Sequence, residues 1–152
     1  MDDIVEEALR HVNPAVREHD LKVVPCDEPA LVNVDARLMV QLVVNLVNNA
    51  IAYTPSGSHI VISIMANDGQ VACSVADDGP GIAPEEQGRI FESFYTVNHG
   101  LADSHRSVGL GLSLCRSIML AHGGSIEVAA ADPHGSVFTI GLPAADVSFD
   151  KE

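Results

Sequence analysis

Asn45 and Asn49 carry side-chain amides one helical turn apart, in a segment that is otherwise rich in Val and Leu. An amide oxygen is a neutral ligand for a hard cation such as Mg²⁺, and an amide NH₂ can donate to a phosphate oxygen. Gln41 lies one turn earlier, so the three amides share one face of a helix. The alternative is an ordinary polar helix face in water, and the spacing alone does not separate the two.

A second group of residues with possible chemistry is Asp77-Asp78-Gly79-Pro80-Gly81-Ile82. Asp77 follows an apolar run with the character of a strand. A carboxylate there can accept a hydrogen bond from an exocyclic amine such as adenine N6, and Gly79 and Gly81 let the backbone approach a flat ring. An ordinary Asp/Gly turn is the alternative.

The third group is Gly109-Leu110-Gly111-Leu112, at the entry to an apolar helical segment. Glycines at a helix start expose backbone N–H groups at the positive end of the helix dipole, where a phosphate can bind. The pattern is neither a Walker loop nor G-x-G-x-x-G, so neither of those nucleotide folds is indicated. Close packing of the helix is the alternative role of these glycines.

Periodicity and turn residues predict the elements that must position these groups. Asp35 has the character of an N-cap, and the apolar spacing after it favours a helix to Tyr53 over a strand. Leu38 is the first residue of that apolar stripe. We expect the other helices at 2–12, 85–91 and 108–121, and strands at 19–25, 30–34, 59–66, 71–77, 125–131 and 136–142. Asn67-Asp68-Gly69 predicts a hairpin, and His122-Gly123-Gly124 a helix end. The sum predicts an α/β sandwich, with three main helices on one face of a mixed, largely antiparallel sheet.

Composition limits the function classes. The net charge is −13 with only eight Lys and Arg, which disfavours nucleic-acid binding. Cys26, Cys73 and Cys115 form no metal-binding pattern, and we expect buried, reduced thiols of a cytosolic protein. There is no signal peptide and no apolar run long enough to cross a bilayer.

The order and spacing of the three groups resembles the histidine kinase/gyrase/Hsp90/MutL ATPase superfamily, whose fold is the Bergerat type. Residues 45–50 match its N box, 77–82 its G1 box, 90–95 its F box and 109–112 its G2 box, and 121–124 match its AHGG ending. The resemblance covers residues 2–143. The F box and the run Leu112-Ser113-Leu114-Cys115 are similar to sensor histidine kinases, and residues 98–114 to their potassium-responsive KdpD-type branch.

The resemblance implies roles residue by residue. Asn49 would bind Mg²⁺ and Asn45 would assist at the phosphates, the two forming the catalytic pair. Asp77 would read the adenine amine, and residues 96–107 would form a lid over ATP. The remaining implied nucleotide contacts are Tyr53, Gly79, Gly81, Ile82, Phe94, Gly109, Leu110, Gly111 and Leu112. The ATPase branches carry a water-activating Glu at the position of Asn45, which an amide cannot replace.

This chain departs from the family pattern at two places. Ala52 stands where many of these kinases have Lys or Arg, which puts one phosphate contact in doubt, and Arg106 is the candidate substitute. Val108 stands where a small hydroxyl residue is common.

None of the seven histidines lies in a phosphoacceptor motif. We therefore expect residues 1–145 to be a monomeric cytoplasmic catalytic domain, and residues 146–152 an acidic tail. The resemblance implies that an upstream dimerisation domain carries the acceptor histidine and that a response regulator is the partner. It also implies that the parent protein is membrane-anchored. We expect this domain itself to contact neither the membrane nor nucleic acid. Two alternatives remain: a serine kinase of the anti-sigma type, and a degenerate nucleotide-binding module.

Overall fold

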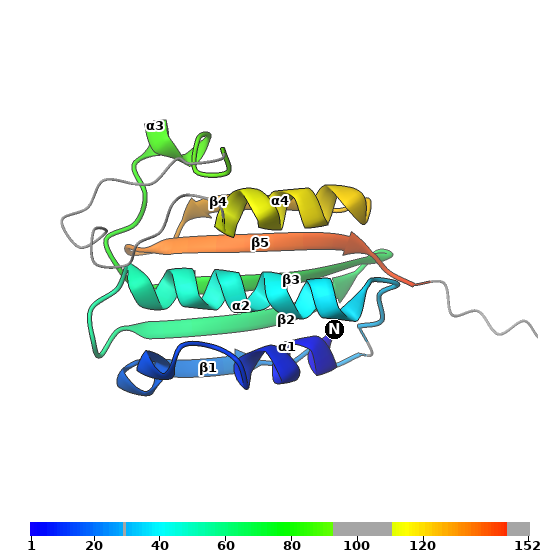
Figure 1. Ribbon diagram of the computed structural model, residues 1–152, viewed down its shortest axis with the longest axis horizontal. Coiled ribbons are helices and arrows are strands. Elements are labelled where there is room, and N and C mark those ends of the chain that lie inside the picture. The colour runs from blue at the N-terminus through cyan, green and yellow to red at the C-terminus, as the bar shows by residue number, and fades with distance from the viewer. Residues whose placement is uncertain (29, 93–110, 146–152) are drawn as a thin grey trace, which may run out of the picture.

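Five strands form one mixed sheet in the computed structural model, which describes residues 1–28, 30–92 and 111–145 (Figure 1). Their spatial order is β1-β2-β3-β5-β4. β1 runs parallel to β2, and the other neighbours are antiparallel. The bounds are β1 Asp20–Val24, β2 His59–Asn67, β3 Gln70–Asp77, β4 Ser125–Ala130 and β5 Ser136–Pro143.

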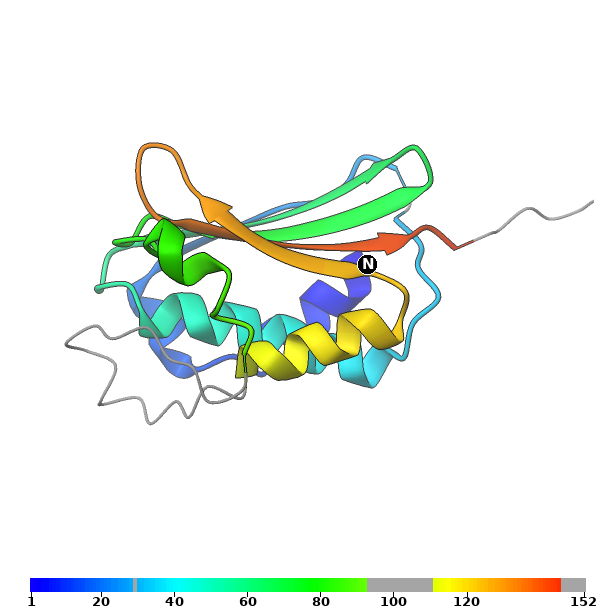
Figure 2. The same ribbon diagram turned by 90° about the horizontal axis from the view of Figure 1, so that it is seen from above.

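The helices α1 (Asp2–Leu9), α2 (Ala36–Ala52) and α4 (Gly111–Ala121) cover one face of this sheet (Figure 2). A 3₁₀ helix, η1 (Pro14–Glu18), precedes β1, and the short α3 (Pro84–Gln87) lies outside the helical layer (Figure 2). The predicted α/β sandwich is therefore confirmed. The apolar residues that alternate along the central strands fill the space beneath the helices: Ile60, Ile62, Ile64, Val71, Cys73, Val75, Phe138, Ile140 and Leu142.

The predicted start of α2 is also confirmed. Asp35 caps the helix, since its Oδ1 accepts hydrogen bonds from the backbone N–H groups of Arg37 (3.0 Å) and Leu38 (3.2 Å). The apolar stripe is buried from Met39 onward, but its predicted first member, Leu38, is 42% exposed. Leu38 lies in the first turn at the margin of the stripe, where the core no longer covers it.

Three predicted elements differ in the structure. The strand expected at 30–34 is a single bridge between Val32 and Ala144, the residue after β5, because β3 and β4 already pair with the two edges of β5. The helix expected at 85–91 ends at Gln87, where Gly88 follows. The helix expected at 2–12 ends at Leu9 with Arg10 as its C-cap, and Asn13 then caps η1.

The cysteines are free thiols. Burial raises the pKa of Cys73 and of Cys115 to about 12, so both are protonated and inert. Cys26 is only partly buried, contrary to the expectation for all three. Among the described residues, no helix has the length and apolar character needed to cross a membrane.

Candidate functional site

Asp77 is the last residue of β3, and its register partners are Ile60 at the start of β2 and Ser136 at the start of β5. The C-terminal end of α2 and the first turn of α4 lie at the same end of the sheet (Figure 1). The fold thus brings together three groups that are some thirty residues apart along the chain. The predicted strand-end position of Asp77 is confirmed.

The Asp77 carboxylate is hydrogen-bonded through only one of its two oxygens among the described residues. Oδ1 accepts hydrogen bonds from the backbone N–H groups of Gly79 (3.0 Å) and Ser136 (3.3 Å). No described residue donates to Oδ2. Burial raises the pKa of Asp77, and the two N–H donors oppose that rise. The side chain is therefore fixed in orientation and keeps one acceptor for a ligand.

Glycines make this arrangement possible. A Cβ at Gly79 would lie 2.6 Å from Thr54 Cγ2, and Gly81, with φ of +82°, faces the Gly135 carbonyl oxygen. Gly135 itself packs on the Asp77 backbone. From the sequence, we expected Gly79 and Gly81 to let the backbone approach a flat ring. In the structure, the absence of side chains at these positions also lets three chain segments meet around Asp77.

Sequence reasoning missed four residues of this cluster. Thr54 donates its hydroxyl to the Ala50 carbonyl (2.7 Å), and His134 Nδ1 lies 3.2 Å from the Gly79 carbonyl oxygen. Gly135 and Ser136 complete the set. A signal existed for the last two, because a small polar residue after a glycine opens the strand that pairs with Asp77.

The asparagines of α2 have separate surroundings. Asn45 Oδ1 accepts from Gln41 Nε2 at 3.3 Å, and the buried Cys115 thiol on α4 donates to the Leu42 carbonyl oxygen, one turn before Asn45, at 3.8 Å. Asn48 Oδ1 accepts the backbone N–H of Asn13 at 2.7 Å, which attaches η1 to α2. Asn49 is partly buried, one turn closer than Asn45 to the end of α2. Asn48 is therefore structural, and Asn45 and Asn49 share the side toward α4.

The side-chain amides of Asn45 and Asn49 suit a cation that binds together with a nucleotide. The described residues contain no group of three His, Cys, Asp or Glu able to hold a metal. Neutral amide oxygens on α2 could complete a coordination shell whose negative ligands are phosphates. Gly111 opens α4 with nothing within 4 Å of the place where a Cβ would be. The residues present fit a magnesium–nucleotide complex.

The other predicted site residues divide into two sets. Tyr53 caps α2, Ile82 accepts a hydrogen bond from Gln87 Nε2 (3.0 Å), and Leu112 packs against the core. Phe94, Arg106, Gly109, Leu110, Val108, residues 96–107 and the tail at 146–152 lie outside the described residues.

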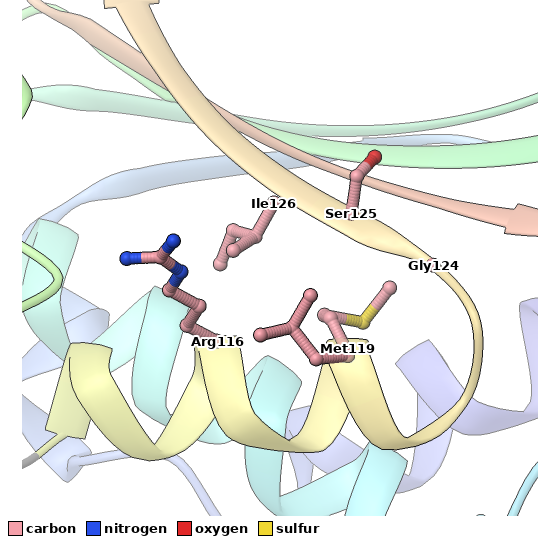
Figure 3. A pocket seen from close by; sticks show the side chains of 6 residues that line it. Arg116, Met119, Gly124, Ser125 and Ile126 are labelled. Atoms are coloured by element: carbon pink, nitrogen blue, oxygen red, sulfur yellow. The ribbon is translucent and has the colours of Figure 1, made fainter.

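A shallow hollow of about 220 Å³ lies elsewhere, between α4 and β4 (Figure 3). Its lining includes Arg116, Met119, Leu120 and Ile126, and none of the predicted site residues. It is on the flank of α4 that faces the edge strand, so it is separate from the Asp77 cluster.

Comparison with known proteins shows the family to which the chain belongs. A family model described as histidine kinase-, DNA gyrase B- and HSP90-like ATPase matches residues 34–146. Sensor protein KdpD of Clostridium acetobutylicum is 34% identical over 143 residues, which are 94% of this chain and 16% of KdpD. The predicted similarity to KdpD-type kinases is confirmed, and the chain spans about a sixth of that relative.

Solved structures share the whole fold. The mycobacterial sensor histidine kinase MprB superposes with a TM-score of 0.84 at 27% identity, covering 97% of this chain and 96% of that chain. The catalytic domain of histidine kinase ThkA gives a TM-score of 0.82 at 30% identity, covering 95% of this chain and 92% of that domain.

Proposed function

The chain belongs to the histidine kinase-, DNA gyrase B- and HSP90-like ATPase family as a histidine kinase catalytic domain, and on that basis we propose that it binds ATP with Mg²⁺ and donates the γ-phosphate to a histidine. The acceptor histidine would be on an upstream dimerisation domain of the same protein. The parent protein would be membrane-anchored, with this domain in the cytoplasm.

The observation that carries the proposal is that Asp77 Oδ2 has no hydrogen-bond donor among the described residues. Its Oδ1 is engaged by Gly79 and Ser136, so Oδ2 is left to accept from the exocyclic amine of adenine. The 6-oxo group of guanine is itself an acceptor and would be rejected there. Tyr53, Gly79, Gly81 and Ile82 would surround the ring.

The polyphosphate would extend from this point toward α2 and α4. Asn49 would supply an amide oxygen to Mg²⁺, which when bound neutralises phosphate charge. Asn45 would donate from its NH₂, because its oxygen already accepts from Gln41. The first turn of α4, with Gly111 and Leu112, would present backbone N–H groups to the phosphates.

A response regulator is the expected downstream partner. ThkA has been crystallised in complex with the response regulator protein TrrA. By analogy, phosphate would pass from the histidine of the parent kinase to such a regulator.

The test is nucleotide affinity of the Asp77→Asn variant, measured by calorimetry. The Asn amide oxygen can still accept from Gly79 and Ser136, which turns its NH₂ toward the adenine amine, so that two donors face each other. Loss of a charged hydrogen bond corresponds to about 30-fold weaker ATP binding, with unchanged folding. The control is Asp68→Asn in the exposed β2–β3 turn, which should bind normally. Equal ATP and GTP affinity of the unaltered protein would refute the adenine assignment.

A further inference from the structure

We propose that His59 is a positioning residue for the nucleotide site, which fixes the loop after Asp77 by bridging Asp20 and Asp78 and does so best when its ring is protonated. This inference rests on the proposed adenine-binding role of Asp77. It adds to that role a residue that does not touch the nucleotide and a dependence of affinity on pH.

The contacts of His59 join three strand ends. Asp78 Oδ1 accepts the His59 backbone N–H at 2.8 Å, and Asp78 Oδ2 lies 2.8 Å from His59 Nδ1. On the other side of the ring, His59 Nε2 is 3.5 Å from Asp20 Oδ2. Asp20 begins β1, His59 begins β2 and Asp78 follows β3, so one imidazole links the ends of all three.

These contacts act on Asp77 through the backbone. Asp77 pairs with Ile60 in the last rung of the β2–β3 ladder, and Asp78 is the next residue. Because His59 contacts both carboxylate oxygens of Asp78, β2 and β3 stay connected for one residue beyond the last backbone pair of their ladder. The loop that contains Gly79 therefore starts from a fixed point, and with it the donor that orients Asp77.

The charge of the ring decides how well the bridge works. A neutral imidazole has one N–H, so it can donate to Asp78 or to Asp20, and its other nitrogen then turns a lone pair toward a carboxylate. A protonated ring donates to Asp78 and at the same time forms an ion pair with Asp20. The hydrogen bond with Asp78 and the charge of Asp78 raise the pKa of His59; burial opposes this rise, and the charge of Asp20 adds a smaller contribution to it. Burial raises the pKa of Asp78, but hydrogen bonds from His59 outweigh it and lower the value.

Other titratable residues are close in the chain to this bridge. Glu18 and His19 precede Asp20, Lys22 is two residues beyond it on β1, and Asp77 precedes Asp78. Ser56 donates to Glu18 Oε1 (2.7 Å), and His19 Nε2 lies 2.8 Å from Thr54 Oγ1. All four are present in every variant proposed below, so their effects are common to all. His134, on the other side of the loop, lies near the Gly79 carbonyl oxygen and has no carboxylate partner among the described residues.

The experiment measures the dissociation constant of Mg-ADP by calorimetry between about pH 5.5 and 8.5, the range in which a histidine titrates. The variants are His59→Gln, His59→Lys and, as a matched control, His11→Gln, which removes an exposed His–Glu pair on α1. Titration of the nucleotide phosphate is the same for all four proteins and cancels in their ratios. Nuclear magnetic resonance locates the titration of the His59 ring.

We expect binding by the unaltered protein to weaken about two- to fivefold as pH rises through the His59 titration, the size of an exposed ion pair. His59→Gln should bind at the weaker level throughout, and His59→Lys, whose charge does not titrate in this range, at the tighter level. His11→Gln should follow the unaltered protein.

The outcomes separate the two proposals. If His59→Gln follows the unaltered protein at every pH, or if Lys behaves like Gln, His59 has no charge-dependent role and the inference is wrong. If the unaltered protein binds no adenine nucleotide at any pH, the proposed function fails first, and the inference fails with it.

Discussion

Gly135 lies so close to Asp77 that a Cβ on Gly135 would overlap the Asp77 carbonyl oxygen. Its φ of +111° is also outside the region that L-residues adopt. The turn between β4 and β5 is thereby pressed against the residue proposed to read adenine, and it supplies the Ser136 N–H that orients the carboxylate. Two segments that are 58 residues apart in sequence form one side of the site.

Replacement of this glycine is therefore expected to damage both stability and binding. Gly135→Ala adds backbone strain and a steric overlap, and should lower the free energy of unfolding by about 2–4 kcal/mol. ATP affinity should fall as well, because Asp77 is displaced. The measurements are urea denaturation and calorimetry. The control is Gly69→Ala, with φ of +78° and open space around it, which should cost about 1 kcal/mol and leave binding unchanged. Equal effects of the two variants would contradict the packing argument.

Asp77 should give opposite pH dependences to stability and to binding. Burial raises its pKa, so the native state holds the proton more tightly than the unfolded chain. Its contribution to stability is then fully present below the unfolded value of about 3.9 and is lost as pH rises through the raised native pKa. The proposed contact with adenine needs the ionised carboxylate, so affinity should instead increase over that window.

Stability and affinity measured across acidic pH, for the unaltered protein and Asp77→Asn, check both signs. The variant should lack both transitions. If affinity is constant down to pH values near the unfolded pKa, the ligand does not depend on the Asp77 carboxylate. If protonated His59 also favours binding, as proposed above, affinity plotted against pH should have a maximum between the titration of Asp77 and that of His59.

The three asparagines of α2 should differ in their effect on magnesium dependence. Asn49→Ala should weaken Mg-ATP binding about tenfold and leave ATP binding in excess EDTA unchanged, because it removes the proposed metal ligand. Asn45→Ala should weaken both, because its NH₂ is the proposed donor to phosphate.

The matched control is Asn48→Ala. It removes the acceptor of the Asn13 N–H, so it should cost about 1 kcal/mol of stability without changing magnesium dependence. Calorimetry with and without EDTA gives the comparison. If the dependence of ATP affinity on magnesium persists in Asn49→Ala and is lost in Asn48→Ala, Asn48 and not Asn49 is the metal ligand.

The purified chain should hydrolyse ATP very slowly. Asn45 stands where the ATPase branches of the superfamily have a water-activating Glu, and its oxygen accepts a hydrogen bond from Gln41. An amide is not a base at neutral pH, so about 10²- to 10⁴-fold of acceleration is missing. A neutral imidazole is already nucleophilic and needs no such base. Rapid steady-state release of phosphate that Asn49→Ala abolishes would show that water is the substrate, and would favour an ATPase over a histidine kinase.

The sequence by itself determined the elements whose signals are local. Helical spacing and the Asp35 cap predicted α2 within one residue of its start, and apolar runs bounded by turn residues predicted β2, β3 and β5. The sheet type and the position of Asp77 at a strand end followed from these elements. Such signals depend on neighbours within a few residues, which is why they can be read without the fold.

Only the tertiary structure decided which residues surround Asp77 and how they act. His59, Gly135 and Ser136 are ordinary strand or turn residues in the sequence, and they become parts of the site because the β2–β3 and β3–β5 registers place them beside it. Asn48 belongs to the same motif as Asn49, but helix packing directs it to Asn13. The strand expected at 30–34 is reduced to one bridge for the same kind of reason, since β5, which its bridge partner Ala144 follows, is already paired with β3 and β4. Register and edge occupancy are properties of residues far apart in the chain, so no local pattern contains them.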